Sequence, residues 1–121
     1  MNVTSIQSEM GTFIMNVGQN EILNVLQHCI VTCNECFDAC LKEEHVAAMS
    51  DCIRLDRDCA DVCSLLVQAI SRNSNQVQTL AKSCIEICEN CARECAKHDH
   101  QHCQKCAEAC LACAKHCQHL V

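Results

Sequence analysis

The cysteines of this chain recur every three or four residues, and this spacing constrains the fold more than any other feature. The spacing is 4-3-4 over residues 29–40 and again over 84–95, and it is 3-4-3-4 over 103–117. An alternation of three and four residues places side chains on one face of an α-helix. Each of these stretches is therefore predicted to be a helix with a stripe of thiols along one side.

A fourth segment fits the same phase, so all sixteen cysteines belong to helical stripes. The full set is Cys29, Cys33, Cys36, Cys40, Cys52, Cys59, Cys63, Cys84, Cys88, Cys91, Cys95, Cys103, Cys106, Cys110, Cys113 and Cys117. Helical bundles normally place Leu and Ile at such positions. A buried Cys can act as a small apolar side chain, but Leu or Ala would pack as well without the risk of oxidation. The pattern therefore predicts a chemical function for the thiols.

The rest of the composition favours an all-α fold. The chain has 121 residues, no Pro and only two Gly, which argues against turn-rich β-structure. It has two Phe and neither Trp nor Tyr, so its core lacks the aromatic volume that stabilises many small domains. We therefore expect a bound ligand or a partner subunit to contribute to stability.

Periodicity and turn signals predict one domain over residues 1–121, with an N-terminal amphipathic helix in 1–18 and a cysteine-lined bundle in 20–120. Thr4 and Gln7 form a capping box for the first helix, and Gly18 ends it. Its apolar face comprises Ile6, Met10, Phe13, Ile14 and Val17. The bundle helices are expected at about 20–44, 46–72 and 75–98, and from the turn at 98–101 to residue 120. Short connections then predict an antiparallel up-down-up-down four-helix bundle with an extra short N-terminal helix.

Antiparallel order brings different residue types to the two ends of the bundle. We expect an aliphatic end formed by Leu26, Leu66, Ile70, Val77, Leu80 and Leu120. The opposite, histidine end combines thiols with other side chains that bind soft metals: Cys40, Met49, Cys52, Cys95, His98, His102 and Cys103. This difference predicts a thiol-lined core that is closed at the aliphatic end and open at the histidine end.

Three histidines and one methionine at the histidine end are candidate metal ligands. His98 lies three residues after Cys95 and His102 lies four residues further, so both continue the helical phase of the thiols. His100 lies at the apex of the turn, and a neutral imidazole binds copper. The alternative is that these histidines are solvated residues of a polar turn. Met49 is either a thioether ligand or a side chain that fills the core.

Position 56 departs from the pattern. A 4-3-4 spacing that starts at Cys52 would place a cysteine there, but the chain has Asp56. A carboxylate oxygen is a hard ligand and a poor match for a soft metal. We therefore expect Leu55 to turn inward and Asp56 to pair with a neighbouring arginine. The alternative is a carboxylate that faces the core.

Disulfides and the usual cysteine motifs fit the sequence poorly. Cysteines three or four residues apart on a helix have Cβ atoms about 5–6 Å apart, whereas a disulfide needs about 3.8 Å. The C-x-x-C pairs at 33/36, 88/91, 103/106 and 110/113 lack the Gly or Pro turns of zinc and iron–sulfur sites. A thiol redox protein that uses one such pair remains an alternative, although the sequence singles out no pair.

The number of thiols favours a monovalent soft metal. Zn(II) ions bound by four thiolates each would leave about eight negative charges in the core. Bridged Cu(I) at about one ion per cysteine leaves the core nearly neutral, and Cu(I) accepts the low coordination numbers that helical neighbours offer. We predict multiple Cu(I) ions per chain, and the spacing alone does not exclude Zn(II), Cd(II) or Ag(I).

Charge and hydropathy exclude other partners. The formal net charge of -6 argues against nucleic acid, which requires a basic surface. No apolar run approaches the roughly 18 residues of a membrane span, and the N-terminus does not resemble an export signal. We therefore expect a cytoplasmic protein, in a compartment that keeps thiols reduced.

The chain resembles the cytosolic branch of the bacterial copper storage proteins over residues 27–120. The resemblance rests on the stripes at 29–40 and 84–95, and on two strings: Cys-Ile-Arg-Leu-Asp-Arg-Asp-Cys-Ala-Asp-Val-Cys at 52–63 and Lys-His-Asp-His-Gln-His-Cys at 97–103. It implies a homotetramer of four-helix bundles and an entrance for copper at His98, His100 and His102. We therefore predict a high-capacity, non-enzymatic Cu(I) storage protein.

Overall fold

The computed structural model describes the backbone of residues 3–121 and the side chains from residue 18 onward. In chain order its elements are α1 (Val3–Leu41), the 3₁₀ helix η1 (Val46–Met49), α2 (Ser50–Ser71), α3 (Val77–Ala96), α4 (Gln101–Cys117) and the 3₁₀ helix η2 (Gln118–Leu120). This part of the chain has no strand, which confirms the all-α prediction. No helix in this range combines the length and the hydropathy that crossing a bilayer requires.

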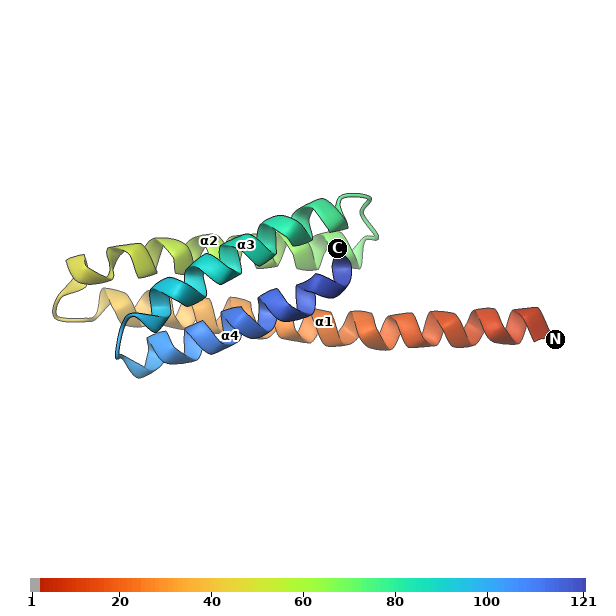
Figure 1. Cartoon of the computed structure of the whole chain (residues 1–121), viewed down its shortest axis with the longest axis horizontal. Coiled ribbons are helices and arrows are strands. Elements are labelled where there is room, and N and C mark those ends of the chain that lie inside the picture. The colour runs from red at the N-terminus through yellow and green to blue at the C-terminus, as the bar shows by residue number, and fades with distance from the viewer. Residues whose placement is uncertain (1–2) are drawn as a thin grey trace.

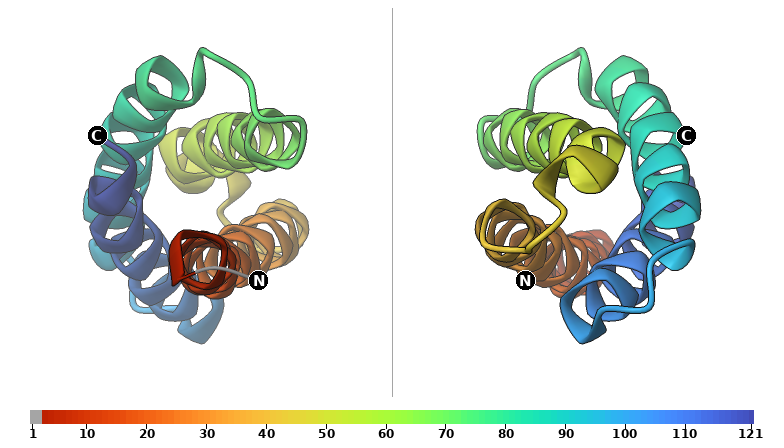
Figure 2. Two further views of the ribbon diagram at one scale, coloured as in Figure 1. Left: turned by 90° about the vertical axis from the view of Figure 1, so that its right-hand side faces the viewer. Right: turned by 90° about the vertical axis from the view of Figure 1, so that its left-hand side faces the viewer.

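The four long helices form a closed ring in which each helix packs against two neighbours (Figure 1, Figure 2). α1 contacts α2 and α4, and α3 contacts the same two helices, so the last long helix returns to the first. Successive helices run in opposite directions. The predicted up-down-up-down four-helix bundle is therefore confirmed.

The turn between α2 and α3 depends on one residue with a left-handed backbone conformation and on one side-chain hydroxyl group. Asn73 has a φ of 54°, in a region that Asn tolerates better than most residues. The backbone N–H of Ser74 donates to the carbonyl of Ala69 at 2.9 Å, and the Ser74 hydroxyl accepts from the backbone N–H of Gln76 at 3.1 Å. These bonds satisfy backbone groups that helix ends leave unpaired, and so they stabilise the reversal of the chain.

The first helix is longer than predicted, because α1 continues without a break from Val3 to Leu41. Gly18 keeps a helical backbone without a positive φ, so the predicted stop there is wrong. A Gly inside a helix costs only about 1 kcal/mol relative to Ala, which is too little to interrupt a long helix. The N-terminal part of α1 extends beyond the other helices (Figure 1). The capping box at Thr4 and Gln7 and the apolar face predicted for residues 1–18 involve side chains outside the described residues.

α1 also ends earlier than predicted, at Leu41, and this places an acidic residue in the loop that follows. The backbone N–H of Glu43 donates to the carbonyl of Cys40 at 3.2 Å, a 3₁₀-type bond that closes the helix. The helix η1 then leads into α2, whose first α-helical residue is Ser50. Glu43 therefore lies in the loop after α1, outside the regular helical spacing of the thiols.

Small side chains beside the cysteines let the helices approach closely. Four alanines that each follow a cysteine in the sequence are buried: Ala60, Ala92, Ala107 and Ala114. The side chains at a helix contact set the distance between helix axes, and alanine keeps that distance short. Short cysteine side chains from different helices can therefore meet on the axis of the bundle.

The two ends of the bundle differ as predicted. The aliphatic end is packed by six side chains that are fully or partly buried: Leu26, Leu66, Ile70, Val77, Leu80 and Leu120. The α2–α3 turn and the C-terminus lie at this end, and the loops after α1 and α3 lie at the opposite end (Figure 1). Apolar side chains thus close one end of the core.

Candidate metal centre

The sulfur atoms of all four bundle helices meet along the axis of the bundle. All sixteen cysteines have zero exposure, and all are free thiols. The Sγ of Cys29 on α1 lies 3.8 Å from that of Cys59 on α2 and 3.9 Å from that of Cys110 on α4. The Sγ of Cys59 lies 3.3 Å from that of Cys88 on α3. The predicted stripes therefore face inward and form one column of thiols.

Sulfur contacts of 4.0 Å or less divide fifteen of the described cysteines into two groups. The inner group, toward the aliphatic end, comprises Cys29, Cys33, Cys59, Cys63, Cys84, Cys88, Cys106, Cys110 and Cys113. The outer group, toward the histidine end, comprises Cys36, Cys40, Cys52, Cys91, Cys95 and Cys103. Cys117, the last thiol of α4, is buried as well. The column is thus continuous within each group.

Neighbouring thiols form overlapping sets that are compact enough to hold a metal ion. In each set the four ligand atoms lie within 4.8 Å of one another. Three of the sets are Cys29, Cys63, Cys88, Cys113; Cys29, Cys33, Cys59, Cys110; and Cys33, Cys91, Cys106, Cys110. Because Cys29, Cys33 and Cys110 each belong to two sets, neighbouring sets share ligands.

Asp56 faces the thiols, contrary to the prediction. It has zero exposure, and its Oδ1 accepts hydrogen bonds from the thiols of Cys106 at 3.2 Å and Cys91 at 3.4 Å. Among the described side chains, Arg57 forms its ion pair with Asp61, at 3.1 Å, and not with Asp56. The phase of α2 explains the error, because position 56 lies on the same face as the cysteines before and after it.

Burial keeps Asp56 and the thiol of Cys103 protonated in the metal-free protein. Burial, followed by the proximity of the ionisable thiols of Cys106, Cys52 and Cys91, raises the pKa of Asp56 to about 10. Burial likewise raises the pKa of the Cys103 thiol to about 12. Near pH 7 both groups are neutral, so a metal ion that binds Cys103 must displace its proton.

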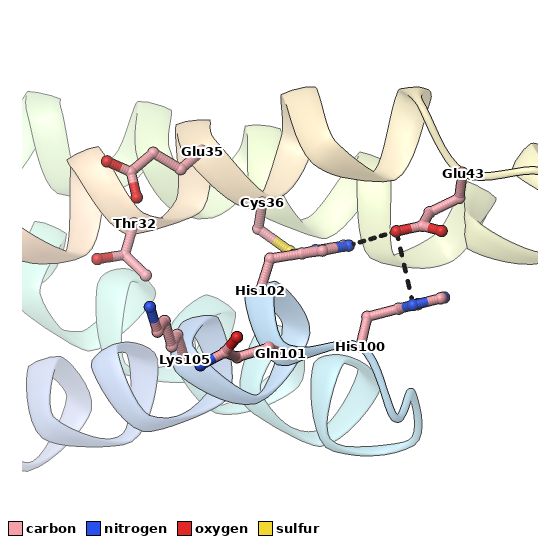
Figure 3. Close-up of a pocket in the computed structure, with 8 residues that line it drawn as sticks. All are labelled: Thr32, Glu35, Cys36, Glu43, His100, Gln101, His102 and Lys105. Atoms are coloured by element: carbon pink, nitrogen blue, oxygen red, sulfur yellow. Dashed lines mark hydrogen bonds and ion pairs between the residues drawn. The ribbon is translucent and has the colours of Figure 1, made fainter.

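His102 is the histidine that the structure brings onto the thiols (Figure 3). Its Nδ1 lies 3.4 Å from the Sγ of Cys36, 3.5 Å from that of Cys103 and 3.9 Å from that of Cys40. The four ligand atoms lie within 4.8 Å of one another. One nitrogen and three sulfurs therefore converge at the histidine end, where the outer group begins.

Glu43 orients His102. Its Oε1 accepts a hydrogen bond from His102 Nε2 at 2.9 Å (Figure 3), and this bond lowers the pKa of Glu43. Because a carboxylate only accepts, the proton of the neutral ring lies on Nε2 and the lone pair of Nδ1 faces the thiols. His100 stacks on His102 with ring centroids 5.3 Å apart, and its Nδ1 lies 3.5 Å from the same Glu43 oxygen.

The other predicted ligands of the histidine end, His98, His100 and Met49, make no hydrogen bond with a cysteine among the described side chains. His98 Nε2 donates to Glu94 Oε2 at 2.9 Å. Met49 is 3% exposed and belongs to the core cluster. Glu43 was not predicted, and its only signal in the sequence is its position three residues after the last thiol of α1.

The chain is similar in sequence to known cysteine-rich proteins. Residues 15–121 match the family described as copper storage protein. The cysteine-rich protein YhjQ of Bacillus subtilis (strain 168) is 48% identical over 90 residues, which cover 74% of this chain and 83% of that protein.

Solved structures of copper storage proteins share the fold. The Cu(I)-bound copper storage protein BsCsp3 is 43% identical with a TM-score of 0.81, and the match covers 85% of this chain and 97% of that one. A cytosolic copper storage protein from Streptomyces lividans, loaded with five coppers, is 38% identical with a TM-score of 0.82, covering 85% and 91%. With the family match over most of its length and this set of buried thiols, the chain belongs to the copper storage protein family.

Proposed function

We propose that this protein stores Cu(I) in a non-enzymatic role, with many ions per chain bound by thiolates of the bundle core. The observation that carries the proposal is the column of sixteen fully buried, free thiols. Packing alone does not require sulfur at these positions, because Ala or Leu fills a helical core equally well. A soft metal, in contrast, gains ligands from several helices at once.

The close spacing of the sulfurs suits an ion that shares its ligands. The Sγ of Cys110 lies 3.6–3.9 Å from those of Cys29, Cys33, Cys59 and Cys106. A thiolate with four such neighbours can bridge two Cu(I) ions, each of which needs only two or three sulfurs. On this basis we propose all sixteen cysteines as ligands and a capacity of about one Cu(I) per cysteine.

At the histidine end, we propose His102 as a nitrogen ligand for incoming copper, because its Nδ1 lone pair faces three thiols. His100 lines the recess beside this cluster, and we propose that His98 and His100 bind copper only in transit. Met49 provides a buried thioether at the same end of the bundle. Copper would therefore meet nitrogen before it reaches the thiols of the core.

Two relatives support the proposal from outside this chain. BsCsp3 is a copper storage protein described in its Cu(I)-bound state, and the Streptomyces lividans protein is described as cytosolic and as loaded with copper. We propose the same metal and the same compartment for this chain. Reducing conditions in the cytosol would keep the thiols free to bind Cu(I).

We further propose that the protein is a homo-oligomer, and specifically a tetramer. The N-terminal part of α1 extends beyond the bundle (Figure 1), and a helix in isolation gains little stability from its own hydrogen bonds. In the sequence, this part carries apolar residues at helical spacing, which a second copy of the chain can cover.

Anaerobic titration of the reduced protein with Cu(I) tests the proposed function. The amount of bound copper should saturate near the number of cysteines, which is sixteen. Atomic absorption of the desalted protein measures it directly. Saturation at four ions or fewer would mean that the thiols do not form a store.

A buffer for Zn(II) or Cd(II) is a second candidate, favoured by the sets of four thiols that lie within 4.8 Å of one another. Four thiolates are the usual ligands of a closed Zn(II) site. Competition between Cu(I) and Zn(II) in one sample distinguishes the two functions. Retention of Zn(II) against an equal concentration of Cu(I) would favour the buffer.

A further inference from the structure

A recess of about 380 Å³ opens between α1 and α4 beside the histidine end (Figure 3). It is lined by eight residues: Thr32, Glu35, Cys36, Glu43, His100, Gln101, His102 and Lys105. The spacing of three and four residues along each helix places these side chains on the two facing walls. Its volume falls within the range of roughly 300–1,000 Å³ that small-molecule sites occupy.

Opposite charges face the recess from its two walls. Glu35 lies on α1 and Lys105 lies on α4, on opposite walls of the recess. Lys105 reaches from α4 toward α1, and the Glu35 carboxylate lies beside the α1 ribbon (Figure 3). Among the described side chains, neither residue takes part in an ion pair. Glu43, the second carboxylate of the lining, is bonded to His102, so Lys105 and Glu35 remain to pair with a ligand that carries both charges.

The inner part of the recess carries atoms that bind soft metals. Cys36 Sγ and His102 Nδ1 lie 3.4 Å apart, and both residues line the recess. Glu43 holds the His102 ring so that Nδ1 faces the sulfur. A metal ion carried into the recess thus meets a sulfur and a nitrogen together.

We propose that the recess binds a small thiol that carries Cu(I), of the class that bears both a carboxylate and an ammonium group, and that the copper then passes to Cys36. This inference rests on the proposed storage of Cu(I). Lys105 binds the carboxylate and Glu35 binds the ammonium group, so the sulfur of the ligand lies toward Cys36. Neither charge has a use in binding a bare Cu(I) ion, which needs only Cys36 and His102.

The transfer is a ligand exchange in which copper remains Cu(I). A bond forms between the ion and Cys36 Sγ, and one bond between the ion and the donor sulfur breaks. The proton of the Cys36 thiol moves to the departing thiolate, which leaves as a thiol. No oxidant or reductant takes part.

Stopped-flow measurement of Cu(I) loading into the reduced full-length protein tests the inference. One donor is Cu(I) complexed by γ-glutamyl-cysteinyl-glycine, which carries both charges, and the other is Cu(I) complexed by 2-mercaptoethanol, which carries neither. The loading rate should saturate with the concentration of the tripeptide complex and rise linearly with that of the uncharged complex. Lys105→Gln and Glu35→Gln should each raise the half-saturating tripeptide concentration about three-fold.

Matched variants control for the loss of charge. Lys115→Gln and Glu108→Gln remove the same charges from exposed positions on α4 outside the recess, and should leave the half-saturating concentration unchanged. An equal effect of Lys115→Gln and Lys105→Gln would show attraction by overall charge and overturn the inference.

Delivery of Cu(I) as its acetonitrile complex separates this inference from the proposed function. All variants should then bind the same amount of copper, near the cysteine count. If this capacity is reached but the tripeptide complex shows no saturation, the recess is not a binding site although storage stands. If the capacity stops at four ions or fewer, the storage function is itself wrong.

Discussion

The Cys106 thiol on α4 donates a hydrogen bond to Asp56 Oδ1 on α2 across 3.2 Å, inside the sulfur column. The same carboxyl accepts from Cys91 and Cys95 at 3.4 and 3.5 Å. Because Cys106 belongs to the inner group of thiols and the other two to the outer group, Asp56 joins the two groups. A carboxyl this far from water is tolerated as the neutral acid, since an unpaired buried charge is very costly.

Asp56 makes the stability of the metal-free protein depend on pH. Its pKa is about 10 in the folded state against 3.8 ordinarily, so between these values the folded state holds a proton that the unfolded state has lost. The contribution of Asp56 to the unfolding free energy should therefore fall as the pH rises, by up to about 1.4 kcal/mol per pH unit. Urea unfolding at pH 5, 6, 7 and 8 should show that the free energy of unfolding falls more steeply with pH for the wild type than for Asp56→Asn.

The exposed Asp58→Asn variant is the control for this experiment, because it removes a carboxylate from the same helix without touching the core. The free energy of unfolding of Asp58→Asn should fall with pH as steeply as that of the wild type. Equal declines in the wild type and in Asp56→Asn would contradict the assignment of a neutral carboxyl to the core.

Glu43 should control the tautomer of His102 and the rate of copper loading. In Glu43→Ala, the ring loses its acceptor at Nε2, so Nδ1–H faces the thiols part of the time and cannot bind copper. We expect loading from the acetonitrile complex to slow about ten-fold, as is common when a partner behind a ligating histidine is removed. Nitrogen-15 NMR of the ring reports the tautomer, and stopped-flow absorbance reports the rate.

Two further variants test whether Glu43 acts by orienting the His102 ring or whether any substitution at the histidine end slows loading. Glu43→Gln retains an oxygen that accepts from Nε2–H and should restore most of the rate. Glu94→Ala removes the equivalent partner of His98, which is not bonded to a thiol, and should leave the rate unchanged. A slow Glu43→Gln variant with the wild-type tautomer would show that Glu43 acts by its charge.

The thiols of α2 should contribute capacity and not helical structure. A variant with Cys52→Ala, Cys59→Ala and Cys63→Ala should bind about three fewer Cu(I) ions, following one ion per sulfur. It should remain helical, because Ala has the highest helix propensity. Circular dichroism and anaerobic titration measure the two properties, and an unchanged capacity would remove α2 from the store.

The N-terminal part of α1 should mediate assembly. Phe13→Asp places a charge among apolar sequence positions and should convert the proposed tetramer into smaller species, as measured by size-exclusion chromatography with light scattering. Thr12→Asp adds the same charge at the adjacent polar position and should leave the mass unchanged. A monomeric wild-type protein would contradict the proposed oligomer.

The sequence was sufficient for the bundle because its strongest signal is periodic. Steps of three and four residues determine the phase of each helix, and the phase determines which side chains face inward. The same rule placed position 56 in the core, and the prediction for Asp56 failed because ligand preference was weighed above helical phase. Four surrounding thiols accommodate its carboxyl, and that arrangement appears only when the helices are assembled.

Glu43 and Gly18 illustrate what the sequence left open. Glu43 lies in a loop and follows no period, so its contact with His102, 59 residues away, depends on how α1 and α4 pack. Gly18 is a common helix stop, but the sequence on both sides of it favours helix, and the backbone continues through it. The contacts of a loop residue, and the effect of a single Gly within a helix, therefore depend on the packing of the whole bundle and cannot be predicted from local sequence.

The aliphatic end has a consequence for how the store empties. Leu26 and Leu66 are completely buried there, so apolar side chains block that end of the core. We therefore expect copper to leave at the histidine end, where an acceptor must bind Cu(I) more tightly than the thiolates do. The affinity of that acceptor for Cu(I) then determines how readily copper is withdrawn.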